Sequence, residues 1–172
     1  VRVNGHTPSA GGGTTVHLEG ADDIDVEVVI VSVGRRPYGD HLGLEDTGVE
    51  RDDRGFVVVD ELCRTGEPGV YALGDLIDTP QLAHVGFAEA IMVVKDILDE
   101  DAVPIDYANV PWAIYCHPEV AFAGLNEEQA REAGHDVVVS KHRFNSNSRA
   151  MILNETDGMV KIIAARGPDG RA

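Results

Sequence analysis

A stretch in the middle of the chain carries the residues best suited to bind a ligand, because an apolar run there ends in Gly74-Asp75. We predict a strand over residues 70–73, and ligands of open α/β sheets bind beyond the carboxyl ends of such strands. Gly74 would let a ligand approach the backbone closely, and Asp75 would offer a hydrogen-bond acceptor to a hydroxyl group. A helix predicted to begin at Gln81 would direct free N–H groups at the same place.

Gly34 and His117 also suggest binding or catalysis, but each has a simpler interpretation. Gly34 ends the apolar run of residues 27–33 and precedes Pro37, so by itself it is typical of a turn at a strand end. His117 precedes Pro118, and we interpret it as a structural histidine and not as a general base. A bare Gly-Asp pair likewise more often caps a turn than binds a ligand. No residue of the chain is assigned a catalytic role.

Neither the cysteines nor the histidines form a pattern typical of a redox or metal site. Cys63 and Cys116 stand in no CxxC or metal-ligand spacing, and we predict free thiols that are buried or partly buried. The 7 histidines are scattered without an HxH or HExxH spacing, so no metal site is predicted.

Charge and hydropathy exclude several classes of partner. The 172 residues include 14 basic and 30 acidic ones, and the formal net charge is −16. So acidic a chain lacks the basic face that nucleic-acid phosphates and anionic membrane surfaces require. No apolar run approaches the roughly 20 residues of a membrane span, and no signal peptide is visible. We therefore expect a cytoplasmic protein with no nucleic-acid or membrane partner, whose length suits one domain or parts of two.

Hydrophobic periodicity predicts the elements that would position these residues. Apolar residues recur at helical spacing over residues 81–100, where Gly86 would mark a close approach of another backbone or a ligand. A second helix over residues 126–133 has Asn126 as its N-cap and Gln129 at the third helical position. Besides a short strand within residues 1–15, strands are predicted at residues 27–33, 56–59, 70–73, 113–115, 137–142, 150–153 and 159–164. Loops or turns are predicted at residues 11–13, 22–23, 41–47 (one helical turn), 54–55, 155–158 (a hairpin turn between the last two strands) and 167–172.

Three segments together resemble the flavoprotein disulfide reductase family. Residues 65–75, TGEPGVYALGD, are similar to its second FAD fingerprint, TxxxxVYAxGD, and QLAH at residues 81–84 looks like the MLAH stretch of its dihydrolipoamide dehydrogenases. Residues 31–37, VSVGRRP, resemble the end of the family's NAD domain. YCHPEVAFAGLNEEQA at residues 115–130 and the later FNSNSRAMILNETDGMVKIIA resemble its interface domain. The segments follow the family's order and spacing over nearly the whole chain.

The resemblance implies roles for individual residues. In the family, the residue matching Asp75 binds a hydroxyl of the FAD ribityl chain, and the backbone of the MLAH stretch faces the pyrimidine oxygen of the flavin. Gln81 replaces the usual Met, which matters little for a contact made by the backbone. Gly34 would lie against NAD. The implied cofactor-binding positions are Gly34, Gly74, Asp75, Gln81, Leu82, Ala83 and His84.

The resemblance also implies the architecture and the partners. The fold would be α/β followed by α+β, with residues 1–37 ending the NAD-binding domain, residues 38–107 forming a central FAD-contacting segment and residues 108–172 beginning the interface domain. The implied reaction is FAD-dependent oxidation of dihydrolipoamide with NAD as acceptor. The implied partners are a second subunit in a homodimer and the lipoyl domains of a 2-oxo acid dehydrogenase complex.

Two alternatives stay open: another disulfide reductase, such as a mercuric, mycothione or glutathione reductase, or a dimerisation module without catalysis. The LAH and RAMILNETDG stretches favour the dihydrolipoamide dehydrogenases. The family's two GxGxxG motifs, its CxxxxC redox pair and its C-terminal His-Glu pair are not among these residues, and Cys63 and Cys116 cannot stand in for the pair. We therefore expect the chain by itself to be inactive.

Overall fold

The computed structural model describes residues 1–167, which fall into two compact units, residues 1–36 and the chain from Pro37 onward. None of the helices within residues 1–167 is long and apolar enough to cross a lipid bilayer. Most of the turn predicted at residues 167–172 lies outside the described residues.

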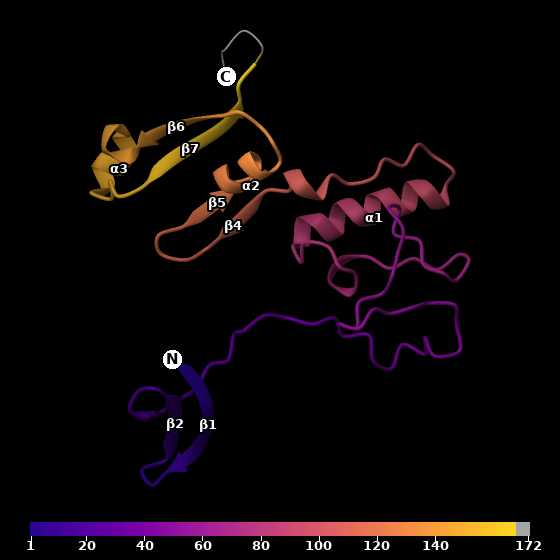
Figure 1. Ribbon diagram of the computed structural model, residues 1–172. Helices are drawn as coiled ribbons and strands as arrows, with labels where there is room; N and C mark the ends of the chain where they lie inside the picture. Colours follow the sequence, from indigo (N-terminus) through magenta and orange to yellow (C-terminus); the bar gives the residue numbers. More distant parts are fainter. Residues whose placement is uncertain (168–172) are drawn as a thin grey trace. The chain divides into compact units, whose positions relative to one another are not determined.

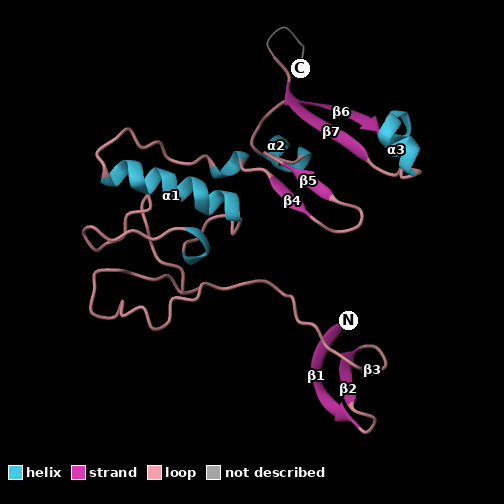
Figure 2. Ribbon diagram, turned by 180° about the vertical axis from the view of Figure 1, so that it is seen from behind, coloured by secondary structure: helices cyan, strands magenta, loops and turns pink. Residues whose placement is uncertain are grey.

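The first unit is a three-stranded antiparallel sheet in the order β1-β2-β3 (Figure 1, Figure 2). Its strands are β1 (Arg2–Ser9), β2 (Gly13–Glu19) and β3 (Ile24–Val26). The predicted glycine loop makes the β1–β2 turn, where Gly12 has a φ of 85° that glycine adopts without steric cost. Gly13 is required at the start of β2, because a Cβ atom there would lie 2.5 Å from the carbonyl oxygen of Val26.

Residues 27–33, predicted as a strand buried on both faces, form no strand and lie exposed. Ile30 and Val33 are 86% and 90% exposed, and no strand within the described residues pairs with this segment. An apolar run of this kind needs neighbouring strands to satisfy its backbone hydrogen bonds and to cover its side chains. The prediction was wrong because periodicity identifies an apolar run but does not supply its partners.

The second unit is built around α1 (Ala83–Ile97), which is shorter at both ends than the predicted helix of residues 81–100. A buried cluster joins α1 to the loops that precede it, and its members are Val57, Cys63, Ala72, Ile77, Met92 and Val93. Near the end of α1, the carboxylate of Asp96 accepts hydrogen bonds from Arg64 Nε at 2.8 Å and from Tyr71 Oη at 2.7 Å. Apolar packing and this carboxylate together hold the preceding loops against the helix.

The strands predicted at residues 56–59 and 70–73 are each reduced to one isolated bridge, Arg51 with Val57 and Arg64 with Tyr71. The N–H of Val57 donates to the carbonyl of Leu76 at 2.9 Å and not to a neighbouring strand. Residues 41–47 likewise form turns without a helix. The strand predictions were wrong because each run has only a short partner. The Val58 N–H donates to the carbonyl of Glu50 at 3.0 Å and the Ala72 N–H to that of Cys63 at 3.1 Å, and neither pairing extends into a ladder.

Two separate two-stranded antiparallel sheets, β4-β5 and β6-β7, follow α1 and the short 3-10 helix η2 (Tyr107–Asn109) (Figure 2). Strand β4 (Trp112–Ile114) pairs with β5 (Val120–Phe122), and the rings of Trp112 and Phe122 stack with centroids 6.0 Å apart. Strand β6 (Val137–Arg143) pairs along its length with β7 (Met159–Ala165). The strands predicted at residues 113–115, 137–142 and 159–164 are therefore confirmed, whereas β5 was not predicted.

Helix α2 (Glu127–Glu132) begins as predicted, with a complete capping box. Asn126 Oδ1 accepts a hydrogen bond from the Gln129 N–H at 2.9 Å, and Gln129 Oε1 accepts one from the Asn126 N–H at 3.0 Å. Two N–H groups of the first turn are thus satisfied by local side chains, which explains why the sequence alone located this helix start.

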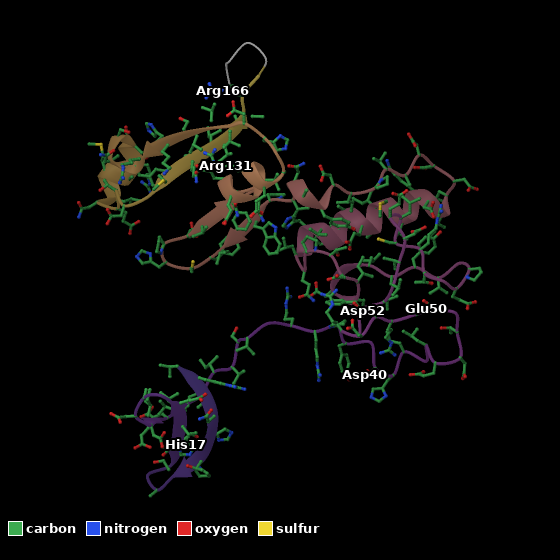
Figure 3. The ribbon with its side chains drawn as sticks, in the orientation of Figure 1. His17, Asp40, Glu50, Asp52, Arg131 and Arg166 are labelled. Atoms are coloured by element: carbon green, nitrogen blue, oxygen red, sulfur yellow. The ribbon has the colours of Figure 1, made fainter. Side chains whose placement is uncertain are left out.

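An ion-pair network joins α2 to β7. Glu127 lies 2.8 Å from Lys161 Nζ and 2.9 Å from the guanidinium of Arg131, whose position on α2 is visible in Figure 3. The hydrogen bond from Lys161, followed by the one from Arg131, lowers the pKa of Glu127 to about 2. The Glu127 carboxylate therefore stays ionised in mild acid and keeps the ion pair between α2 and β7.

Residues 150–153, predicted as a strand, belong instead to helix α3 (Ser148–Leu153), which follows the 3-10 helix η3 (Phe144–Ser146). Asn147 caps α3 by accepting a hydrogen bond from the Ala150 N–H at 3.0 Å, and Asn154 ends it with a φ of 55°. Residues 155–158 therefore connect α3 to β7 and do not form the predicted hairpin between two strands. The prediction was wrong because β6 already pairs with β7, so no strand remains to pair with residues 150–153.

Candidate functional site

The predicted Gly-Asp motif forms a tight turn directly before the segment that leads to α1. It is the 3-10 helix η1 (Gly74–Leu76), in which Gly74 has a φ of 67° and its carbonyl accepts the Ile77 N–H at 3.1 Å. Gly74 suits this position because residues with a Cβ adopt that backbone region only at a steric cost. The following Asp75 is exposed.

Helix α1 packs directly on this turn. A Cβ atom built on Gly86 would lie 3.7 Å from the Cα of Gly74, so the two backbones approach closely at this pair of glycines. This confirms the prediction that Gly86 marks a close approach of another backbone.

The start of α1 carries no side-chain cap. Its N-cap residue is Leu82, whose side chain makes no capping hydrogen bond, and Ala83 and His84 are exposed. The side chain of His84 lies 3.0 Å from the carbonyl of Pro111, which can only accept, so Nε2 carries the proton in this hydrogen bond. The N-cap residue therefore supplies no side-chain acceptor to the first turn of α1.

A buried carboxylate, which the sequence analysis missed, ties these parts together. Glu89 lies on the inner face of α1 and is 0% exposed. Its Oε2 accepts the Gly74 N–H at 2.6 Å, and its Oε1 accepts the hydroxyls of Thr79 at 2.8 Å and Tyr107 at 2.9 Å. The available signal was its spacing, because Glu89 falls one turn after Val85 and about one turn before Met92 on the apolar face of the helix.

The surroundings of Glu89 keep neighbouring groups neutral. Burial, followed by the negative charge of Glu89, raises the pKa of the Cys63 thiol to about 11. Burial and the hydrogen bond to Glu89 also raise the pKa of the Tyr107 phenol. Cys63 is thus an unreactive core thiol, whereas Cys116 is exposed, which corrects the prediction that both thiols are at least partly buried.

The structure brings six of the seven predicted cofactor-binding positions into one unit. Gly74, Asp75 and residues 81–84 belong to the second unit, where η1 and α1 are in contact. Gly34 belongs to the first unit and is exposed, with a φ of 112°. His117 lies exposed in the loop between β4 and β5. Within residues 1–167, no cluster of three or more His, Cys, Asp or Glu residues is arranged to hold a metal ion.

The chemistry of the donor set suits a cofactor with hydroxyl and carbonyl groups. The exposed carboxylate of Asp75 can accept a hydrogen bond from a hydroxyl, and Gly74 presents no side chain to obstruct it. The N-terminus of α1 can donate backbone N–H groups to a carbonyl or anionic oxygen. These groups can bind and orient a cofactor, but the described residues include no pair of thiols that could exchange with a disulfide.

Two family profiles match the chain. Residues 1–90 match the pyridine nucleotide-disulphide oxidoreductase profile, and residues 110–171 match the dimerisation domain of the pyridine nucleotide-disulphide oxidoreductases. The predicted fold, a region of FAD/NAD-binding type followed by a dimerisation domain, is confirmed by these matches.

Curated relatives include several dihydrolipoyl dehydrogenases. The enzyme of Bacillus subtilis strain 168 is 46% identical over 147 residues, which cover 86% of this chain and 31% of that protein. The mitochondrial enzyme of Homo sapiens is 42% identical over 173 residues, which cover 98% of this chain and 34% of that protein. The chain therefore spans about a third of the length of these relatives.

Solved structures support the same fold. LpdA from Mycobacterium tuberculosis superposes with a TM-score of 0.88 at 25% identity, over 96% of this chain and 36% of that one. The HOCl-induced flavoprotein disulfide reductase RclA from Escherichia coli superposes with a TM-score of 0.86 at 28% identity, over 95% of this chain and 38% of that one.

Proposed function

Because the chain belongs to the pyridine nucleotide-disulphide oxidoreductase family, we propose that it is part of a FAD-dependent dihydrolipoyl dehydrogenase, which oxidises dihydrolipoamide with NAD as acceptor. Identities of 46% and 42% to dihydrolipoyl dehydrogenases support this choice over other disulfide reductases. The observation that carries the proposal is the Gly74–Asp75 turn, which packs on a helix whose exposed start has no side-chain cap.

The residues of this turn and helix would hold one side of the flavin. The Asp75 carboxylate would accept a hydrogen bond from a ribityl hydroxyl, and Gly74 would leave room for the cofactor chain. The backbone of Gln81, Leu82, Ala83 and His84 would face the pyrimidine oxygen. When bound, FAD would supply the chemistry of passing electrons from a dithiol to NAD.

The remaining parts of the chain would serve NAD binding and assembly. Residues 1–37 would end the NAD-binding domain with Gly34 bordering NAD, and residues 38–107 would contact FAD. Residues 108–172 would build a two-fold dimer with a second subunit, a role supported by the match to a dimerisation domain. The lipoyl domains of a 2-oxo acid dehydrogenase complex would be the partners of the whole enzyme.

The substrate assignment is tested with a complete oxidoreductase that carries residues 1–172. We expect it to reduce NAD⁺ with dihydrolipoamide, and to turn over glutathione disulfide, mycothione disulfide or Hg(II) far more slowly. Efficient reduction of one of those three without activity on dihydrolipoamide would replace the proposed substrate. The 172-residue chain assayed alone should be inactive, because it contains no redox pair.

The cofactor assignment is tested by an absorption spectrum of the purified oxidoreductase together with its intact mass. A flavin spectrum with one FAD per chain is expected. The same measurement on the 172-residue chain shows whether η1 and α1 retain FAD without the rest of the enzyme. A complete, folded protein that neither contains nor takes up flavin would contradict the proposal.

A further inference from the structure

Glu89 is a fully buried carboxylate that accepts hydrogen bonds from three donors. Burial of a carboxylate is costly unless donors compensate for the lost water. Here a backbone N–H and two hydroxyls do so, at 2.6, 2.8 and 2.9 Å. Burial of an apolar side chain at this position would cost less free energy. The presence of a carboxylate here therefore needs an explanation.

The three donors come from three different segments of the second unit, one of which is the turn assigned to the proposed flavin site. Gly74 opens the turn that carries Asp75, Thr79 lies between this turn and α1, and Tyr107 lies in η2 beyond the end of α1. The two hydroxyls share Oε1, so they orient the carboxylate and direct Oε2 at the Gly74 N–H. The hydrogen bond to Gly74 then holds the turn at the point where Gly86 lets α1 approach it.

The packing of α1 has a second carboxylate anchor that does not touch this turn. Asp96 is bonded to Arg64 and Tyr71 and holds the loops near the far end of the helix. Glu89 and Asp96 each accept three hydrogen bonds, but Glu89 binds the turn at Gly74, whereas Asp96 binds the loops near the far end of α1. General stabilisation of α1 therefore does not explain why Glu89 is aimed at Gly74.

We propose that Glu89 is a positioning residue of the cofactor site, which fixes the Gly74–Asp75 turn relative to the start of α1 before the flavin binds. The inference rests on the proposed function, because the turn and the start of α1 are assigned to the flavin there. Glu89 is buried and acts through Gly74 and not by touching the cofactor. With the turn fixed in advance, flavin binding does not have to order it.

The test compares Glu89→Ala and Glu89→Gln with Asp96→Ala as the matched control. In the 172-residue chain, Glu89→Ala should speed hydrogen exchange of the Gly74 amide by about tenfold or more. Glu89→Gln should restore protection to within about threefold, because its carboxamide oxygen can accept the Gly74 N–H while its NH₂ donates to the two hydroxyls. Asp96→Ala should lower the melting temperature without changing Gly74 exchange.

A second readout is the FAD dissociation constant of the complete oxidoreductase, followed by flavin fluorescence. Glu89→Ala should raise this constant about tenfold, as expected for loss of one charge-assisted hydrogen bond at the site. The FAD dissociation constant of Glu89→Gln should stay close to that of the unsubstituted enzyme. The constant of Asp96→Ala should stay close to it as well, even if this substitution lowers the melting temperature as much as Glu89→Ala does.

Three outcomes separate the possibilities. Unchanged Gly74 exchange in Glu89→Ala would overturn the positioning role. Equal weakening of FAD binding by Glu89→Ala and Asp96→Ala, in proportion to lost stability, would reduce Glu89 to a structural residue. Absence of flavin from the unsubstituted oxidoreductase would instead overturn the proposed function, and the exchange of Gly74 would still decide whether Glu89 holds the turn.

Discussion

At the scale of single residues, the proposed site divides its work between exposed and buried groups. Asp75 is exposed, whereas Glu89 is buried and bonded to the backbone of the preceding Gly74. In the proposed site, Asp75 would accept a hydrogen bond from the cofactor, and Glu89 would hold the turn that carries Asp75. Two carboxylates of the same chemistry thus have different roles, which are set by their surroundings.

Replacing Asp75 by Ala should weaken FAD binding by the complete oxidoreductase. Loss of a hydrogen bond from a ribityl hydroxyl to a carboxylate should cost about 1–3 kcal/mol, or roughly 5- to 150-fold in the dissociation constant. Fluorescence titration with FAD measures the change. Asp78→Ala, which removes a nearby exposed carboxylate paired with Arg54, serves as the control and should leave affinity unchanged. Equal affinities for all three proteins would remove Asp75 from the site.

The two thiols should react at different rates. Cys116 is exposed and Cys63 is buried, with the pKa of the Cys63 thiol raised to about 11 by burial and by the charge of Glu89. At pH 8 we expect Ellman's reagent to modify one thiol quickly in the folded chain and the second only after unfolding. Fast reaction of both thiols in the folded state would show that the core around Cys63 opens readily.

Cys63 should also make stability depend on alkaline pH. Its pKa is about 11 in the folded chain against 9.0 for an ordinary thiol, so the unfolded state loses this proton first. The free energy of unfolding should therefore be unaffected below pH 9 and fall between pH 9 and 11, by on the order of 2 kcal/mol. Urea titrations at pH 8 and 10.5 measure this. Cys63→Ala should show a smaller fall relative to its own value at pH 8.

At the scale of elements, α2 and α3 each carry a local N-cap, although only α2 was predicted as a helix. Asn126 with Gln129, and Asn147, satisfy the first-turn N–H groups of α2 and α3 from within the same few residues. Helix α1 has no such cap and depends on packing and on Glu89 and Asp96 for its position. The uncapped end is the one assigned to the cofactor, where a ligand would take the place of a cap.

Removal of the α2 cap should destabilise the C-terminal part of the chain. Asn126→Ala loses the hydrogen bond to the Gln129 N–H and breaks the capping box, which should cost about 1 kcal/mol. Thermal unfolding should show a melting temperature lower by several degrees. Glu132→Ala, at the exposed end of the same helix, should change the free energy of unfolding by only a few tenths of a kcal/mol. Equal effects of both substitutions would show that the cap contributes little.

At the scale of the whole molecule, residues 110–167 expose many large apolar side chains. Those at least 45% exposed in β5, α3 and β7 are Val120, Phe122, Met151, Ile152, Leu153, Met159, Val160 and Ile162. Large apolar side chains exposed in such number are typical of a segment that contacts another protein. Since this segment matches a dimerisation domain, a second copy of the chain is its expected partner.

A charge in this surface should weaken self-association. We expect sedimentation equilibrium to detect a dimer of the oxidoreductase, and Ile162→Glu to raise its dissociation constant at least about tenfold, because burial of an unpaired carboxylate is costly. Val103→Glu, at an exposed position outside the matched domain, should leave the dimer intact. A protein that is monomeric at every concentration would contradict the dimer.

Much of the site could be predicted from the sequence, because its signals are local. The glycines at residues 74 and 86 each indicated a close approach to the backbone, and the structure places the two beside each other. Glu89 was missed because an acidic residue in a helix is usually solvated. Only its burial and its three hydrogen-bond donors show that it connects α1 to the Gly74 turn. The roles of Gly34, Asp75 and residues 81–84 in cofactor binding stay predictions.

The sequence by itself determined the features that depend on neighbouring residues, which are the capping box of α2, the extended segments of β6 and β7 and the glycine turns, and it indicated the family. Only the tertiary structure determined which backbone groups form hydrogen bonds with each other where more than one partner was possible. Residues 27–33 remained unpaired, residues 56–59 and 70–73 formed one isolated bridge each, and residues 150–153 became part of α3. The physical reason is that a strand exists only with a partner, and no short stretch of sequence states which partner will be there.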